Sequence, residues 1–163
     1  MKVVLLGLSG TGKTTIGNIL KKTYGFPVVE ADDDVHQRYN GIWPDQEALI
    51  DASFEETNRQ VLRMQHVFFI TSWLEKDIIA SFSAHGFCLL LLVAPLEDLL
   101  QRRQQRDGKY PPALLKRVQH NHRVFLDIVQ EPTISTLFAL TLDMSKTTTQ
   151  QAISLTMNLI ADR

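Results

Sequence analysis

The sequence has little of what marks a secreted or membrane protein. Cys88 is the single cysteine among 163 residues, so no disulfide can form within the chain, which is typical of the reducing cytoplasm. No apolar run approaches the roughly 20 residues of a membrane span, and only Met1 and Lys2 precede the first apolar run, too little for a signal peptide. We therefore expect a cytoplasmic protein with no membrane partner.

The chain also lacks an excess of positive or negative charge, and its histidines lack the spacing of metal ligands. The formal net charge is −1, which gives no electrostatic case for a nucleic-acid partner. The histidines show no metal spacing, and we expect no zinc site; they are His36, His66, His85, His120 and His122. Hydrophobic residues make up 44% and charged residues 21%, the composition of a globular protein. The length fits a single domain over residues 1–163.

The most informative segment is the glycine-rich stretch at residues 7–14, GLSGTGKT. An apolar run at residues 3–6 precedes it and a helical pattern follows it, which is the strand–loop–helix context that a G-x-x-x-x-G-K-[ST] motif, the P-loop, requires. A chance Lys-Thr pair after a glycine-rich turn would not need this context. The motif therefore predicts that the chain binds a nucleoside triphosphate, and ATP is the default because no guanine-reading motif is present.

The P-loop physics assigns roles within this stretch. Glycines allow unusual backbone dihedrals that turn the loop N–H groups inward, and the positive end of the following helix points at the same place. Lys13 is expected to reach the β- and γ-phosphates and the Thr14 hydroxyl to ligate Mg²⁺. The predicted nucleotide-binding residues are Gly7, Ser9, Gly10, Thr11, Gly12, Lys13, Thr14 and Thr15.

An acidic cluster follows the second apolar run at residues 28–29. Glu30, Asp32, Asp33 and Asp34 are four carboxylates in five positions, at the end of a strand, where ligands bind in open α/β sheets. A helix starting at residue 33 or 34 would explain one or two of them as N-terminal acids, but not all four.

Three further residues allow two readings each. Trp43 lies in a turn near the acidic cluster and is either part of a substrate pocket or a partly buried anchor. Thr71 and Ser72 end the third apolar run and either contact phosphate, a Mg²⁺-bound water or substrate, or cap the next helix.

A basic cluster supplies the charge that a triphosphate needs. Arg102, Arg103, Arg106 and Lys109 lie within eight residues, in an otherwise neutral protein. Cations at a helix end also suit the helix dipole, which explains part of the cluster.

The apolar runs alternate with helical patterns, and this alternation predicts a parallel sheet with helices on both sides. The expected strands are residues 3–6, 28–29, 67–71, 87–93 and 137–142. The expected helices are residues 13–24, 33–39, 46–65, 74–84, 95–106 and 113–129, with a last one around residues 153–160. The fold class is therefore α/β, a three-layer α/β/α P-loop NTPase fold with a five-stranded parallel sheet and a short lid segment at about residues 103–115.

These features resemble the small P-loop kinases of metabolites, the shikimate kinase and gluconate kinase group. Residues 12–17 and the segment 99–107, followed by Pro112, resemble shikimate kinases, and the helix end at residues 130–132 resembles gluconate kinases. Glu30-Ala31-Asp32 stands where shikimate kinases place a D-x-D motif. Two departures are that Glu55 replaces their substrate-carboxylate arginine, and that Ser72-Trp73-Leu74 replaces their triple glycine.

The resemblance implies an ATP- and Mg²⁺-dependent kinase. Glu30 would join Thr14 in the metal shell, Asp32 would contact the acceptor hydroxyl, and Arg103 or Arg106 would lie over the phosphates. The predicted catalytic residues are Lys13, Asp32, Arg103 and Arg106, and the predicted substrate residues are Asp32, Asp34 and Trp43.

The expected reaction is transfer of the γ-phosphoryl group to a hydroxyl of a sugar acid or polyol, by a monomer or homodimer. One alternative is a nucleoside or nucleoside monophosphate kinase, for which Trp43 and Tyr39 are the hints of a base-stacking pocket. An alternative of another class is a regulatory P-loop protein that binds nucleotide without a small acceptor.

Overall fold

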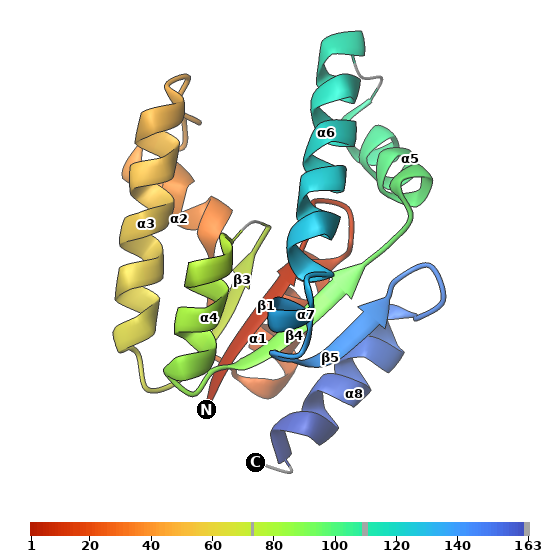
Figure 1. Cartoon of the computed structure of the whole chain (residues 1–163). Helices are drawn as coiled ribbons and strands as arrows, with labels where there is room; N and C mark the ends of the chain where they lie inside the picture. Colours follow the sequence, from red (N-terminus) through yellow and green to blue (C-terminus); the bar gives the residue numbers. More distant parts are fainter. Residues whose placement is uncertain (73, 109–110, 162–163) are drawn as a thin grey trace.

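Five parallel strands form one sheet, in the order β2-β3-β1-β4-β5, with helices on both faces (Figure 1). The computed structural model describes residues 1–72, 74–108 and 111–161, and for residues 112–114 the backbone only. The elements are β1 (Lys2–Gly7), α1 (Lys13–Tyr24), β2 (Val28–Glu30), α2 (Ala31–Arg38), α3 (Glu47–Arg63), β3 (Val67–Thr71), α4 (Lys76–Ala84), β4 (Cys88–Val93), α5 (Leu96–Asp107), α6 (Pro112–Val129), α7 (Pro132–Ser135), β5 (Phe138–Asp143) and α8 (Thr149–Ala161). The predicted five-stranded parallel sheet is confirmed.

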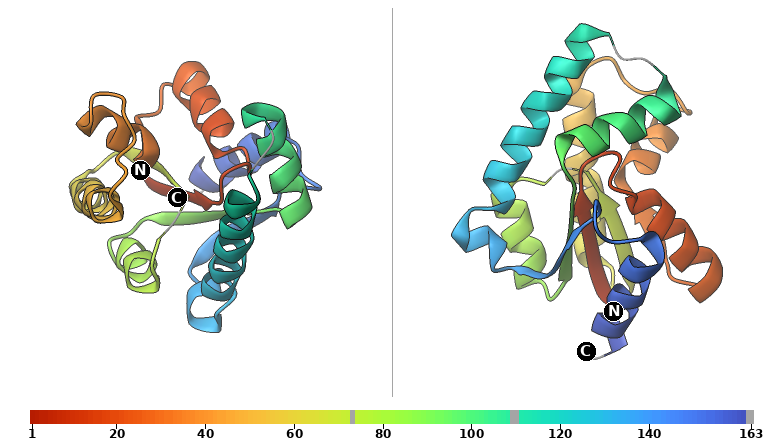
Figure 2. Two further views of the ribbon diagram at one scale, coloured as in Figure 1. Left: turned by 90° about the horizontal axis from the view of Figure 1, so that it is seen from above. Right: turned by 90° about the vertical axis from the view of Figure 1, so that its right-hand side faces the viewer.

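The core consists of two apolar layers, one on each face of the sheet. Successive strand side chains point to opposite faces, so Val3 and Leu5 pack with α1 and α8, while Val4 and Leu6 pack with α3, α4 and α6. Figure 2 shows the sheet between these two helical layers. Because both faces are covered, the central strands are apolar at nearly every position, as the sequence pattern predicts.

The central strand β1 positions the functional loop. Strand β1 pairs with β3 on one side and β4 on the other, and the chain leaves its carboxyl end into residues 8–12. Ligands of open parallel sheets bind outside the carboxyl ends of the strands. The N-terminus lies at the opposite end of the sheet (Figure 1).

Most predicted elements agree with the observed ones to within one or two residues, and α1 agrees at both ends. This helix ends because Gly25 adopts φ 70° and its N–H bonds the carbonyl of Leu20, the left-handed cap that the sequence indicates. One prediction was wrong, and one short helix was not predicted. Helix α2 begins at Ala31, directly after β2, and not at residue 33 or 34. The short helix α7 was not predicted; it has Pro132 in its first turn, where the missing N–H costs nothing.

Among the described residues, no helix combines the length and the apolar character that crossing a bilayer demands.

Candidate active site

The glycine-rich loop turns tightly between β1 and α1. Gly10 and Gly12 have φ of 97° and 95°, in the left-handed region that favours glycine. Buried Thr11 holds the turn, because its N–H and its hydroxyl both bond the carbonyl of Leu8, at 3.2 and 2.8 Å. The loop therefore has the backbone shape that the motif predicts.

Gly7 differs from its predicted role. It has no positive φ, and it does not line the cavity beside the loop. A Cβ at this position would lie 2.7 Å from the carbonyl oxygen of Leu92 and 2.9 Å from the Thr11 hydroxyl. Gly7 is thus required by close packing of β1 against β4, and it stands apart from the other predicted nucleotide-binding residues, which all line the cavity.

Lys13 is a buried cation at the start of α1. Its side chain is almost fully buried, and its Nζ donates to the carbonyl of Leu8 at 3.1 Å. Burial lowers the pKa of Lys13 to about 8, because the charged form loses water, although Asp32 and Glu30 act in the opposite direction. A negatively charged ligand at this place would stabilise the ammonium.

A cavity of about 550 Å³ opens beside the loop and is large enough for a nucleotide. It is lined by Ser9, Gly10, Thr11, Gly12, Lys13, Thr14, Thr15, Glu30, Asp32, Ser72, Arg102, Arg103, Arg106, Met144, Thr147, Thr148 and Thr149. The first-turn N–H groups of α1 have no intrahelical acceptor, and Gly12 at the N-cap offers no side-chain cap. We call this space the donor cavity, after the phosphoryl donor that the glycine-rich motif predicts. The loop, the N-terminus of α1 and the cations form an anion-binding wall.

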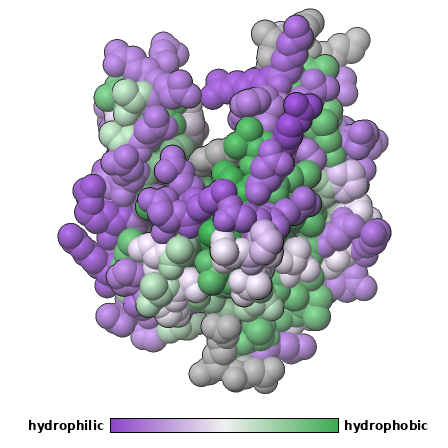
Figure 3. All heavy atoms as spheres, viewed as in Figure 1, coloured by the Kyte–Doolittle hydropathy of each residue, from purple (hydrophilic) through white to green (hydrophobic). Residues whose placement is uncertain are grey.

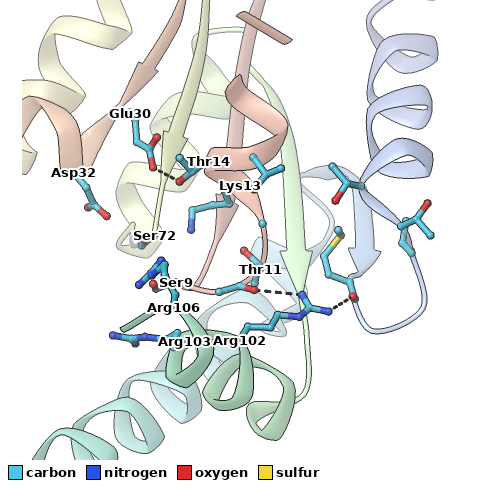
Figure 4. Close-up of a pocket in the computed structure, with 17 residues that line it drawn as sticks. Ser9, Thr11, Lys13, Thr14, Glu30, Asp32, Ser72, Arg102, Arg103 and Arg106 are labelled. Carbon is cyan, nitrogen blue, oxygen red and sulfur yellow. Dashed lines mark hydrogen bonds between the residues drawn. The ribbon is translucent and has the colours of Figure 1, made fainter. Parts of the chain in front are cut away.

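Two carboxylates face these cations. The Thr14 hydroxyl donates to Glu30 Oε1 at 2.5 Å, and Asp32 lies one residue into α2. Figure 4 shows Lys13, Glu30 and Asp32 pointing into the same space. Burial raises the pKa of both carboxyls; the Thr14 hydrogen bond opposes this at Glu30, and the charge of Lys13 opposes it at Asp32.

The donor set fits a magnesium ion that is held mainly by a bound nucleotide. No group of three or more His, Cys, Asp or Glu side chains within the described part of the chain could hold a metal alone. Mg²⁺ at nucleotide sites uses one or two protein oxygens, phosphate oxygens and water. Thr14 and Glu30, in contact with each other at the cavity wall, supply such oxygens.

Helix α5 brings three arginines to the opposite wall. Arg102, Arg103 and Arg106 all line the donor cavity (Figure 4), and Arg106 also donates to the carboxylate of Asp107, at 2.6 and 2.7 Å. Of the residues expected in the lid segment, Lys109 and Tyr110 lie outside the described residues.

Arg102 belongs to the predicted basic cluster but was not among the predicted catalytic or binding residues. Its guanidinium donates to the carbonyls of Gly10 at 3.3 Å and Met144 at 2.7 Å, so it ties α5 to the loop and to the end of β5. Helical spacing is the signal that could have indicated it, because positions 99, 102, 103 and 106 share one face of a helix.

One end of the donor cavity is formed by the connection between β5 and α8. Its lining residues there are Thr147, Thr148 and Thr149. No sequence motif indicates them, since a threonine run before a helix is equally typical of a cap. Ser72, which had two readings, lines the cavity; Trp73 lies outside the described residues.

A second cavity, of about 440 Å³, adjoins the first. It is lined by Leu8, Ser9, Trp43, Glu47, Ile50, Asp51, Phe54, Ser72, Leu99, Arg103, Arg117, Val118, Asn121 and His122. Ser9, Ser72 and Arg103 line both cavities, so the two spaces meet there. Trp43 lies on its wall, and we call this space the acceptor cavity.

Asp34 is a correction to the predicted substrate residues. It lines neither cavity, and its carboxylate instead accepts hydrogen bonds from Arg38 at 2.8 Å and from the Thr57 hydroxyl. Tyr39 is also absent from the wall of the second cavity, and its hydroxyl donates to the carbonyl of Leu49 in α3 at 3.4 Å. Asp34 therefore fastens α2 to α3.

Known proteins share this architecture. No protein-family model matches the chain. A shikimate kinase of Nitrosomonas europaea is 30% identical in an alignment of 108 residues that covers 61% of this chain and 51% of that protein, so the match spans about half the length of this relative. The likeness in sequence supports the resemblance to that kinase group.

Solved structures match over nearly the whole chain. A shikimate kinase from Acinetobacter baumannii, in complex with shikimate, has a TM-score of 0.76 at 17% identity, covering 99% of this chain and 93% of that chain. A gluconokinase from Sinorhizobium meliloti has a TM-score of 0.64 at 18% identity, covering 99% and 96%. The predicted three-layer α/β/α P-loop NTPase fold is confirmed.

Proposed function

We propose that this protein is an ATP- and Mg²⁺-dependent kinase that transfers the γ-phosphoryl group to a hydroxyl of a small metabolite. The observation that carries the proposal is the meeting of two cavities at Ser9, Ser72 and Arg103, one walled by phosphate-binding groups and the other by the α3 and α6 side chains. A nucleotide-binding regulator would need the first cavity but not the second. The sequence resemblance implies a sugar acid or a polyol as the acceptor; the proposal itself requires only a small metabolite with a free hydroxyl.

We assign a role to each of the main residues of the donor cavity. Lys13 and the loop N–H groups hold the β- and γ-phosphates, and Thr14 and Glu30 would hold Mg²⁺, which neutralises phosphate charge when bound. Arg103 and Arg106 stabilise charge that develops on the transferred group. Arg102 fixes the position of α5, which carries both of them.

Asp32 is the residue that acts on the acceptor. It receives the hydroxyl proton as the oxygen bonds to the γ-phosphorus and the bond to the bridging oxygen breaks, which releases ADP. Burial raises the pKa of Asp32, which makes it a better base than an exposed aspartate, although the positive charge of Lys13 acts in the opposite direction. In phosphoryl transfer most of the rate comes from positioning and charge.

The nearest alternative is a nucleoside or nucleoside monophosphate kinase. Trp43 and Phe54 favour it, because their rings lie 6.4 Å apart on the side of the acceptor cavity and could stack on a base. We also propose a cytoplasmic monomer or homodimer, in keeping with the single, buried cysteine.

An acceptor screen tests the proposal. ADP formation and phosphorylated product are measured with MgATP and sugar acids, polyols, amino alcohols and amino sugars, nucleosides or nucleoside monophosphates, with Lys13→Met as the control for contaminating activity. The proposal expects one class to raise turnover well above background hydrolysis. If no class does so while ATP still binds, the regulatory reading replaces the kinase.

A further inference from the structure

The acceptor cavity lies between two helices that carry different charges. Helix α3 contributes Glu47, Ile50, Asp51 and Phe54, whose spacing of three and four residues places them on one face. Figure 1 shows that α3 and α6 rise past the carboxyl edge of the sheet on opposite sides, and Figure 3 shows a notch between two lobes in the same view. The opposite wall comes from α6, through Arg117, Val118, Asn121 and His122.

The α3 wall carries two carboxylates one helical turn apart. Neither Glu47 nor Asp51 forms an ion pair or a side-chain hydrogen bond with any other residue that the structure describes. Like charges four residues apart on a helix destabilise it. The helix dipole favours Glu47, in the first turn, but reaches Asp51 in the second turn only weakly. A cationic ligand between them would remove the repulsion.

The cations that line the cavity come from other helices, Arg103 from α5 and Arg117 from α6. Arg103 is shared with the donor cavity and serves the phosphates, and the His122 ring lies 3.3 Å from the Ala94 carbonyl. Arg117 is the remaining cation among the described lining residues, on the wall opposite Asp51. Outside the donor cavity, the lining is thus net negative.

Aromatic rings accompany the carboxylates. Trp43 and Phe54 line the cavity beside Glu47 and Asp51, with their rings tilted by 57° to each other. A ring face attracts a cation, most strongly when the ring is that of tryptophan. Carboxylates and ring faces on one wall are a donor set for an ammonium group.

We propose that the acceptor is an amino-bearing alcohol, such as an amino alcohol or an amino sugar. This inference rests on the proposed kinase function. Glu47 and Asp51 bind its ammonium group, and Trp43 and Phe54 pack against the carbon next to it. Arg117 and Asn121 donate to its other oxygens from the opposite wall. This leaves the reactive hydroxyl at the junction of the cavities, on the side of Asp32.

Matched acceptors that differ in charge test this proposal. One set is glucosamine, glucose and gluconate, and the other is 3-amino-1,2-propanediol, glycerol and glycerate. The expected result, in any set that is phosphorylated, is a kcat/KM for the amine at least about tenfold above that of the neutral and the acidic compound. The ratio of amine to neutral acceptor should fall as the pH rises through the pKa of the amine.

Two variants assign the preference to the α3 wall. The double change Glu47→Gln and Asp51→Asn should lower kcat/KM for the amine about tenfold or more, while the KM for ATP and the rate with neutral acceptors stay the same. Glu55→Gln is the matched control, since Glu55 is the next carboxylate in the same helical row and is exposed like Glu47 and Asp51 but, unlike them, does not line the cavity.

Preference for the neutral or acidic acceptor, or an unchanged amine rate in the double variant, would overturn this inference and leave the proposed kinase in place. If none of the six compounds, nor any class in the acceptor screen, is phosphorylated, the kinase itself fails.

Discussion

At the scale of single residues, the burial of Lys13 favours the binding of an anionic ligand but lowers the stability of the protein without ligand. Its ammonium is buried, and in the protein without ligand its nearest recorded partner is the carbonyl of Leu8. A pKa lowered from 10.5 to about 8 means that the folded state binds fewer protons than the unfolded state between these values. The burial of Lys13 therefore costs no stability above about pH 10.5, where the lysine is neutral in both states. The cost grows as the pH falls and is fully present below about pH 8.

We predict that Lys13→Met stabilises the protein without ligand and abolishes ATP binding. The pKa difference corresponds to about 3 kcal/mol at pH 7, an upper figure because the protein relaxes around the charge. Urea unfolding should show the gain at pH 7 and little of it at pH 10.5. A variant that is less stable than the wild type at pH 7 would show that the buried ammonium is not the cost that we infer.

The same residue predicts proton uptake on binding. Phosphates next to Lys13 should raise its pKa again, so at pH 8.5 to 9 the protein should take up a proton when ATP binds. Calorimetry in two buffers of different ionisation enthalpy measures this uptake, and the Glu55→Gln protein serves as the control. Equal binding heats in the two buffers would contradict the burial of a neutral lysine at that pH.

At the scale of elements, α5 and the glycine-rich loop form one unit. A Cβ on Gly10 would lie 3.2 Å from the carbonyl oxygen of Leu99 in α5, so loop and helix are in close contact. Arg102 adds its hydrogen bonds to Gly10 and Met144. The positions of Arg103 and Arg106 thus depend on the contacts that α5 makes with the glycine-rich loop and with the end of β5.

Arg102→Met should raise the KM for ATP about tenfold, with a smaller effect on kcat, because hydrogen bonds of a charged donor are lost. Steady-state kinetics measure both. The control is Gln105→Met, at an exposed position of the same helix. An unchanged KM for ATP would mean that α5 is held without this arginine.

Helix α1 is placed on the sheet by a glycine. A Cβ at Gly17 would lie 2.2 Å from Cδ1 of Ile70, so Gly17→Ala should destabilise the protein by about 1–3 kcal/mol although alanine favours helices. Adding Ile70→Val removes that methyl group and should recover part of the loss in a thermal melt. Asn18→Ala, at an exposed position of α1, should change little. If the double variant is no more stable than Gly17→Ala, the contact is not the cause.

At the scale of the whole molecule, the local parts of the site could be predicted and the long-range parts could not. The loop and Lys13 follow from a contiguous motif, which constrains the backbone locally. The walls of the acceptor cavity were only indicated at Trp43, because no local pattern tells which face of α3 meets which face of α6.

Asp32 and Asp34 show why a small error in an element matters. The start of α2 was expected two or three residues too late. In the actual helix, positions 32 and 34 are about 200° apart around the axis, so Asp32 faces the donor cavity and Asp34 bonds Thr57 and Arg38. The sequence cluster alone did not distinguish these two carboxylates.

The central claim, that Asp32 acts on an acceptor hydroxyl held where the two cavities meet, is tested most directly by comparing Asp32→Asn with Asp34→Asn. With the acceptor that the screen identifies, the account predicts that Asp32→Asn lowers kcat at least about 100-fold and leaves the Kd for ATP within a few-fold, whereas Asp34→Asn keeps kcat near the wild-type value in protein that is folded by circular dichroism. An Asp32→Asn protein that phosphorylates the acceptor at close to the wild-type rate would contradict the account.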